Sequence, residues 1–281
     1  KNFIIKGMVM KIDFSTAFGL AAGVIIIAIG IISTDGNLYW FANGIALLIV
    51  LGGTFSATLV NYPIKNLLGL YNVLKNVFTS ESYDYHSVIK DIVIIAGKAR
   101  KKGVHSLEDD LNKIDDKFLR KGIELAINER DTKRLRTFLS LEMDNIARRH
   151  NSGQEIFFYM GSYAPAFGML GTIMGLIIMM KSFSGAESLG QIETIDFDIA
   201  EKFATLLGGM GMALITTFYG VLFSNLVFLP IGGKLKRKSE DELMLRNIIL
   251  EGIMSIHAKE HPILIQEKLM TFVQESKRTV K

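Results

Sequence analysis

The chain has 281 residues, no cysteine and a formal net charge of +4, and 49% of its residues are hydrophobic. The lack of cysteine excludes disulfide bonds, cysteine-ligated zinc and thiol catalysis. The small basic excess fits either a nucleic-acid partner or a membrane surface, and its distribution along the chain decides between them.

Four stretches without Asp, Glu, Lys or Arg predict transmembrane helices. They cover residues 14–34, 36–64, 156–180 and 203–233. A helix needs about 20 apolar residues to cross the hydrocarbon core, and in lipid its backbone must satisfy its own hydrogen bonds. A large soluble helical core is the alternative, but four such runs are rare outside membranes. Because Asp35 opens a short turn directly into the second stretch, the first is interpreted as a span rather than a cleaved signal peptide.

The distribution of basic residues indicates the orientation of these spans. All but two of the 32 lysines and arginines fall in residues 1–13, 61–155 or 234–281, and the interiors of the loops 33–40 and 182–201 contain none. Cytoplasmic segments of membrane proteins carry the excess of Lys and Arg. We therefore expect both termini and the middle segment in the cytoplasm, with the basic excess at a membrane surface and no nucleic-acid partner.

The predicted fold is all-α, an integral membrane protein with four transmembrane helices. The expected parts are a cytoplasmic N-terminal tail (1–13), spans one and two (14–34 and 41–62), a cytoplasmic helical domain (63–155), span three (156–181), a periplasmic loop (182–201), span four (203–231) and a cytoplasmic C-terminal helix and tail (232–281).

Within the cytoplasmic domain, we predict helices over residues 64–78, 85–102 and 107–128. A further helix is capped at Asp131-Thr132, and no proline follows until Pro165. One long helix should therefore run from this domain into span three. Span four should continue into the C-terminal helix, unless Gly232-Gly233 bends it.

The span cores contain no Asp, Glu, Lys, Arg or His. A protein that relays protons or coordinates cations by itself usually keeps an ionisable residue in the membrane. The hydroxyls of Thr172, Thr216 and Thr217 can offer oxygen ligands to a hard cation, but they cannot accept a proton at neutral pH. If ions pass here, a partner chain must supply the carboxylate. The alternative, preferred for Thr205 and Ser224, is that such hydroxyls bond to their own or neighbouring helices.

Spans three and four each present small residues at helical spacing. The two faces are Ala164, Gly168, Gly171 and Gly175 in span three, and Gly209, Ala213, Gly220 and Ser224 with the Thr216-Thr217 pair in span four. Such faces permit close helix–helix approach, either as simple packing within the chain or as an inner layer around a partner. Pro165 lies near the start of span three and Pro230 near the end of span four. Each either limits a helix or acts as a hinge in a conformational change.

No enzyme motif is present. The sequence lacks a glycine-rich phosphate loop, His-Glu-x-x-His and Gly-x-Ser-x-Gly, so we predict neither enzyme activity nor a cofactor. His257 and His261 have i, i+4 spacing but no third ligand, which argues against a metal site.

The cytoplasmic domain carries a basic cluster beside an acidic one. Arg100-Lys101-Lys102 is followed by Glu108-Asp109-Asp110 across a short turn. This is either an ordinary solvated surface or a docking patch of both signs, in which complementary charges steer a partner and set its register.

Several segments resemble the MotA/PomA stator subunits of bacterial flagellar motors. They are Ala-Arg-Lys-Lys-Gly-Val-His-Ser-Leu-Glu (99–108), Tyr-Ala-Pro-Ala-Phe-Gly-Met-Leu-Gly-Thr-Ile-Met-Gly-Leu (163–176), Ala-Leu-Ile-Thr-Thr-Phe-Tyr-Gly (213–220) followed by Pro230, and Thr-Ala-Phe-Gly-Leu (16–20). The similarity covers nearly the whole chain. The related ExbB/TolQ transducers share the Gly-Thr pattern of span three, but they have three spans and an outward N-terminus.

The resemblance implies a bacterial inner-membrane stator, with five copies ringed around two MotB-type chains. A MotB-type span would bring an Asp to face Thr172 and Thr217. Sodium-type relatives tend to carry a Thr-Thr pair where this chain has Thr216-Thr217, so Na⁺ is favoured over H⁺ as the transported ion.

The resemblance also implies that Arg100 and Glu108 lie at the interface with the rotor protein FliG, and we extend this patch to Lys101 and Asp109. It makes Pro165 and Pro230 conformational relays. The alternatives are an ExbB/TolQ-like ion-driven energy transducer and a self-sufficient ion channel or transporter.

Overall fold

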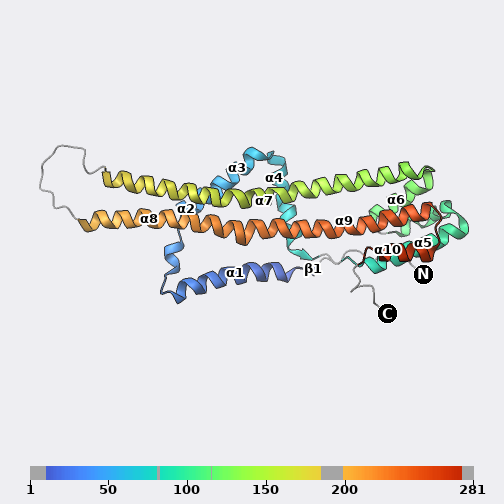
Figure 1. The fold of residues 1–281 in the computed structure, drawn as a ribbon, viewed down its shortest axis with the longest axis horizontal. Coiled ribbons are helices and arrows are strands. Elements are labelled where there is room, and N and C mark those ends of the chain that lie inside the picture. Colours follow the sequence, from blue (N-terminus) through green and yellow to red (C-terminus); the bar gives the residue numbers. More distant parts are fainter. Residues whose placement is uncertain (1–10, 81–82, 115, 185–198, 274–281) are drawn as a thin grey trace. The chain divides into compact units, whose positions relative to one another are not determined.

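The computed structural model describes residues 11–80, 83–114, 116–184 and 199–273, and helices dominate it (Figure 1). The α-helices are α1 (Phe14–Ser33), α2 (Gly44–Leu47), α3 (Gly53–Asn61), α4 (Ile64–Val77), α5 (Tyr85–Lys102), α6 (Lys117–Asn128), α7 (Thr132–Ser184), α8 (Ile199–Leu222), α9 (Leu229–His257) and α10 (Pro262–Met270). The segments η1 (Leu38–Phe41) and η3 (Val104–Lys113) are 3-10 helices, and η2 (Leu48–Gly52) and η4 (Phe223–Phe228) are π-helices.

The predicted all-α class is confirmed, with one small addition. Two strands of two residues each, β1 (Lys11–Ile12) and β2 (Thr79–Ser80), pair antiparallel, with Lys11 opposite Ser80.

The chain divides into two compact units, which are described separately. The helical unit comprises the described residues within Lys1–Ile12, Thr79–Asn151 and Leu235–Lys281. The membrane unit comprises Asp13–Phe78 and the described residues within Ser152–Lys234. Both α7 and α9 contain residues of both units. Helix α7 runs from Thr132 to Ser184 with Pro165 inside it, which confirms the expected long helix.

Four helices are long and apolar enough to cross a membrane, as the sequence predicts. They are Phe14–Ser33, Gly44–Asn61, Thr132–Lys181 and Leu206–His257, counting the π-helical turns as part of their helices. Helix α1 has no buried residue, and the side chain of Phe14 is 77% exposed. Such a surface is untenable in water over a whole helix, whereas lipid solvates it.

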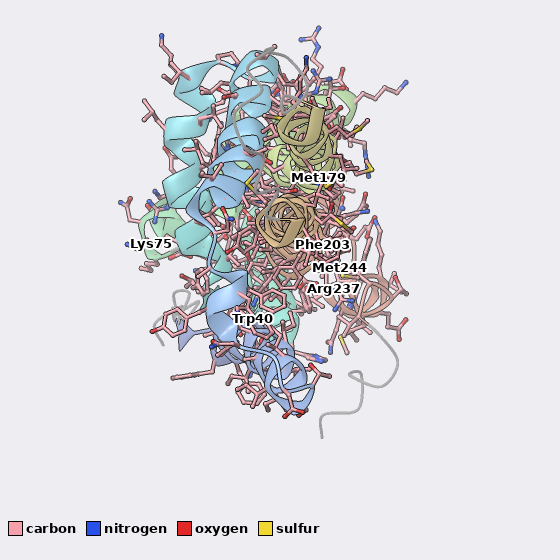
Figure 2. The ribbon with its side chains drawn as sticks, turned by 90° about the vertical axis from the view of Figure 1, so that its left-hand side faces the viewer. Trp40, Lys75, Met179, Phe203, Arg237 and Met244 are labelled. Atoms are coloured by element: carbon pink, nitrogen blue, oxygen red, sulfur yellow. The ribbon has the colours of Figure 1, made fainter. Side chains whose placement is uncertain are left out.

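Exposed aromatic residues mark the turn between the first two spans. Tyr39 and Trp40 on η1 are 85% and 65% exposed, and Figure 2 labels Trp40 together with Phe203, another exposed aromatic of the membrane unit. Tyr and Trp concentrate where a membrane meets water, because one part of the ring system is apolar and another forms hydrogen bonds. The turn therefore has the composition of a membrane–water boundary.

The helical unit has one hydrophobic core, built by α5, η3, α6, α10 and the parts of α7 and α9 that belong to this unit. Its fully buried side chains include Ile92, Leu119, Leu139, Ile253 and Ile265. Residues 107–128, predicted as one helix, form the 3-10 helix η3 and the separate helix α6. Asp116 caps α6 by accepting a hydrogen bond from the Leu119 amide at 2.7 Å, which starts a new helix at that point.

Candidate functional site

Two hydroxyls predicted to line an ion path meet between α7 and α8. The Thr172 hydroxyl on α7 is hydrogen-bonded to the Thr217 hydroxyl on α8. Its oxygen also lies 3.1 Å from the carbonyl oxygen of Gly168 and 3.0 Å from that of Ala213. A hydroxyl has only one proton to donate, so these acceptors compete for it. The result is a cluster of side-chain and backbone oxygens that two half-buried threonines present from adjoining helices.

Thr216 lies differently from its neighbour Thr217. Its side chain is fully buried, and its hydroxyl donates to the carbonyl of Ala213 at 2.7 Å. A Cβ added to Gly171 would lie 2.7 Å from the Thr216 Cβ, so Thr216 fills the contact between the two helices. In this structure the hydroxyl oxygens of Thr172 and Thr217 lie together and could ligate a cation. Thr216 instead packs in the contact between α7 and α8.

The small-residue faces predicted on spans three and four do pack against each other, and Figure 1 shows α7 and α8 side by side. A Cβ on Gly168 would lie 3.0 Å from the Thr216 carbonyl oxygen, and one on Gly220 would lie 2.7 Å from that of Ala164. Glycine at these positions brings the two backbones into contact. This close approach is what places Thr172 within reach of Thr217.

The two prolines occupy different helical contexts. Pro165 lies inside α7, and Pro230 is the second residue of α9, directly after the π-helix η4. Proline lacks a backbone N–H and leaves a carbonyl of the preceding turn without its usual partner. Gly232-Gly233 does not interrupt α9, so the irregularity of the fourth span lies before Pro230.

The predicted charge patch lies on the helical unit. The geometry of η3 determines which of its acidic residues are buried and which are exposed. In a 3-10 helix, residues i and i+3 lie on the same side. Leu107 and Asp110 are therefore both buried, whereas Glu108 and Asp109 are exposed. At the end of α5, Arg100 and Lys101 are exposed as well.

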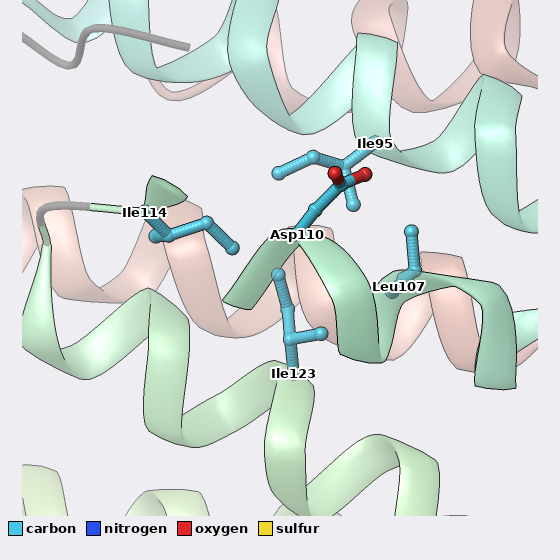
Figure 3. A pocket seen from close by; sticks show the side chains of 5 residues that line it. All are labelled: Ile95, Leu107, Asp110, Ile114 and Ile123. Carbon is cyan, nitrogen blue, oxygen red and sulfur yellow. The ribbon is translucent and has the colours of Figure 1, made fainter. Parts of the chain in front are cut away.

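Asp110 is separate from the exposed acidic pair. Asp110 lines a space of about 10 Å³ together with Ile95, Leu107, Ile114 and Ile123, and this space is no larger than one water molecule. Figure 3 shows the carboxylate of Asp110 next to Ile95. Lys113 donates to this carboxylate at 2.7 Å, and Lys98 forms a second ion pair with it. These two hydrogen bonds, with Lys113 the larger effect, lower the pKa of Asp110. Asp110 therefore anchors η3.

Two contacts of the membrane unit were not predicted from the sequence. The Tyr219 hydroxyl donates to the Phe41 carbonyl and accepts from the Asn43 amide at 3.4 Å, which ties α8 to the turn between the first two spans. The Lys234 ammonium donates to Asp13 and Thr16 at the beginning of α1. Tyr219 and Thr16 lie in the segments that resemble the MotA/PomA family, but the sequence contains no signal for their partners.

Comparison with known proteins identifies the family. Residues 110–248 match the model of the MotA/TolQ/ExbB proton channel family. The chain is 32% identical to motility protein A of Borreliella burgdorferi, over 96% of each chain. The chain belongs to the MotA family. It is also 33% identical to the uncharacterized protein YtxD of Bacillus subtilis, over 93% of this chain and 91% of YtxD.

The fold of this MotA-family chain agrees with a solved stator. The structure of the flagellar MotAB stator complex from Bacillus subtilis matches with a TM-score of 0.79 and 26% identity, over 95% of this chain and 98% of that one. The resemblance inferred from residues 99–108, 163–176 and 213–220 is thereby confirmed. The family consists of channel proteins rather than enzymes, and membership of the family together with the four apolar helices supports an inner-membrane protein.

Proposed function

We propose that this chain is a stator subunit that couples an ion flow to flagellar rotation together with a MotB-type partner. The observation that carries the proposal is the Thr172–Thr217 oxygen cluster in spans that contain no ionisable side chain in their cores. Such a cluster can solvate a cation but cannot bind a proton at neutral pH. The similar complex from Bacillus subtilis contains a MotB chain, which supports a partner that brings the missing acid.

In the proposed ion path, an Asp on the single span of the partner faces Thr172 and Thr217. The carboxylate supplies the charge, and the hydroxyl and carbonyl oxygens supply further ligands for a partly dehydrated ion. The resemblance of the Thr216-Thr217 pair to that of sodium-type relatives favours Na⁺ over H⁺. The buried Thr216 holds α8 against Gly171, so its contribution to the path is to position Thr217.

The proposed output is torque on the rotor protein FliG. Arg100, Lys101, Glu108 and Asp109 form the rotor patch, and all four are exposed on the helical unit. Pro165 and Pro230 relay the conformational change from the ion path toward that unit. The proposed assembly has five copies of this chain around two MotB-type chains.

This function requires the predicted orientation. Residues 1–13, 63–155 and 232–281 then lie in the cytoplasm, and residues 182–201 lie in the periplasm. Spans 14–34, 41–62, 156–181 and 203–231 cross the inner membrane. The concentration of lysine and arginine in the segments assigned to the cytoplasm supports this arrangement.

The test is ion flux through the chain with and without its partner. Liposomes containing the chain and the MotB-type protein, with any channel-blocking segment of the partner removed, should conduct Na⁺, and liposomes with the chain alone should not. Thr217→Val should lower the flux at least tenfold. Thr54→Val is the matched control, because the Thr54 hydroxyl is buried and bonds to Val50 of its own helix. Steady flux through the chain alone would contradict the proposal.

The choice of ion has its own measurement. Cells that depend on this stator should swim faster as external sodium rises at constant pH. A swimming speed that does not depend on sodium would overturn the preference for Na⁺ and leave H⁺ as the coupling ion.

A further inference from the structure

A cavity of about 330 Å³ lies in the membrane unit between the beginning of α1 and the end of the fourth span. Its volume is within the range of small-molecule sites. One wall comes from α1 and the other from η4 and α9. The lining residues are Ser15, Thr16, Gly19, Leu20, Leu226, Pro230, Ile231 and Lys234.

The cavity exists because α1 contacts the fourth span at two separated points. At the deeper point, Gly23 meets Leu226 so closely that an added Cβ would lie 2.4 Å from the Leu226 Cδ1. At the shallower point, the Lys234 ammonium is bonded to the Asp13 carboxylate and the Thr16 hydroxyl. Between these contacts the two helices leave a gap beside Pro230.

The two ends of the cavity differ in polarity. Asp13 caps the first turn of α1, so the end with Ser15, Thr16 and Lys234 lies where the span begins. The remaining wall is apolar, apart from backbone atoms. An ammonium group has three donors, and within the described residues Lys234 uses two of them, on Asp13 and Thr16. One donor remains for a ligand at the polar end.

We propose that this cavity binds a glycerophospholipid of the surrounding leaflet, with the phosphate at Lys234 and part of an acyl chain against Leu20, Leu226 and Ile231. The space is open on one side rather than enclosed by protein, and in a bilayer the nearest material to fill an apolar groove of this size is lipid. A cation at the membrane end of an apolar slot matches the amphipathic character of a phospholipid. The proposal depends on the membrane placement of the spans and is independent of ion passage.

The bound lipid has a structural role in this arrangement. It fills the space next to Pro230 and keeps α1 apart from the fourth span between its two contacts. A side chain large enough to occupy the same space should displace it. Gly19 is the position for such a side chain, because no atom lies within 4 Å of a Cβ added there.

The experiment uses the full chain with its partner, reconstituted with a phosphatidylglycerol that carries a photoactivatable group on one acyl chain. Mass spectrometry then maps the crosslinked peptides. Wild type should crosslink within residues 15–20 and 226–234, and Gly19→Leu should lower this yield at least fivefold. Gly30→Leu is the matched control: it lies on the same helix, also has no atom within 4 Å of its added Cβ, and should leave the yield unchanged.

The phosphate contact is tested with Lys234→Gln and a photoactivatable diacylglycerol that lacks the headgroup. Wild type should prefer the phospholipid probe by about fivefold, which corresponds to one lysine near a lipid phosphate, and the variant should lose this preference. Free inorganic phosphate at millimolar concentration should not compete. Competition by free phosphate would replace the lipid with a simple anion and overturn the proposal.

A second copy of the chain is the competing occupant. Because the protein has no cysteine, Gly19→Cys gives a single thiol. When this thiol carries a photoactivatable crosslinker, crosslinks from it to a second copy of the chain instead of to lipid would show that a neighbouring chain covers the cavity, and they would overturn the proposal. An unchanged crosslinking yield in Gly19→Leu would do the same.

Discussion

The Ser224 hydroxyl donates a hydrogen bond of 2.6 Å to the carbonyl oxygen of Gly161. Gly161 precedes Pro165 by four residues, so this carbonyl is the one that loses its helical partner to the missing proline N–H. Ser224 lies in the π-helix η4, which ends just before Pro230. A side chain of the fourth span thus satisfies the backbone group that a proline frees in the third.

Ser224→Ala should destabilise the protein by about 1–3 kcal/mol, because it leaves the Gly161 carbonyl without a partner. Thermal unfolding of the purified complex, followed by circular dichroism, measures this effect. Asn225→Ala is the control, because the exposed Asn225 amide donates, within the part of the chain that the structure describes, to the Val221 carbonyl of its own helix at 3.0 Å. Its effect should stay within about 0.5 kcal/mol.

The dependence on Pro165 makes a sharper prediction. Pro165→Ala restores an N–H that can bond to Gly161, so Ser224→Ala should then cost much less than in the wild-type background. A double-mutant cycle measures this coupling, which should exceed about 0.5 kcal/mol. Strictly additive effects would show that the Ser224 bond does not compensate for the proline.

Gly220→Ala should separate α7 from α8. The added Cβ would lie 2.7 Å from the Ala164 carbonyl and 3.1 Å from the Pro165 Cα, and both are backbone atoms that cannot rotate away. Overpacking of this kind costs about 1–3 kcal/mol, and here it should also pull Thr217 away from Thr172 and reduce motility. Gly211→Ala on the same helix meets no atom within 4 Å and should swim normally. Equal swimming of the two variants would show that the close helix contact is dispensable.

The sequence predicts the spans because apolar composition over about 20 residues determines them locally. It also predicts the close packing of α7 on α8, since the glycines repeat at helical spacing. It does not predict the Ser224–Gly161 bond, whose residues lie 63 positions apart, nor the division of residues 107–128 into η3 and α6. In the acidic run 108–110, sequence alone cannot distinguish the buried Asp110 from its exposed neighbours, because that difference depends on Lys98 in another helix.

Asp110→Asn should loosen η3, whereas Asp109→Asn should not. The Asp110 pKa is lowered by Lys113 and Lys98, so the stabilising charge is present above the ordinary pKa of 3.8 and is lost as the pH falls below it. At neutral pH, Asp110→Asn should cost about 1–3 kcal/mol, and the gap to wild type should close at low pH. Hydrogen–deuterium exchange of peptides that cover η3 measures this. Equal protection of η3 in both variants at neutral pH would contradict the anchoring role.

Charge reversal separates the rotor patch from this anchor. Glu108→Lys should lower swimming speed while leaving the exchange protection of η3 intact, because the Glu108 side chain is exposed. A charge reversal on FliG should restore part of the speed if the two residues pair. Normal swimming of the Glu108→Lys strain would remove Glu108 from the rotor patch.

Asp91→Asn should stabilise the protein at neutral pH. Among the described residues, Asp91 on α5 is the one whose buried carboxylate oxygen has no hydrogen-bond partner, and burial raises its pKa. A raised pKa means that the folded state loses stability as the pH rises above 3.8, where the unfolded carboxyl ionises, and that this loss is complete above the folded pKa. The neutral amide avoids this loss of stability, so the melting temperature at pH 8 should rise by about 2–4 °C, and this gain should shrink toward pH 4.

Asp144→Asn, at an exposed position of α7, is the control and should leave the melting temperature unchanged at both pH values. A lower melting temperature for Asp91→Asn at pH 8 would contradict this account of the Asp91 carboxylate.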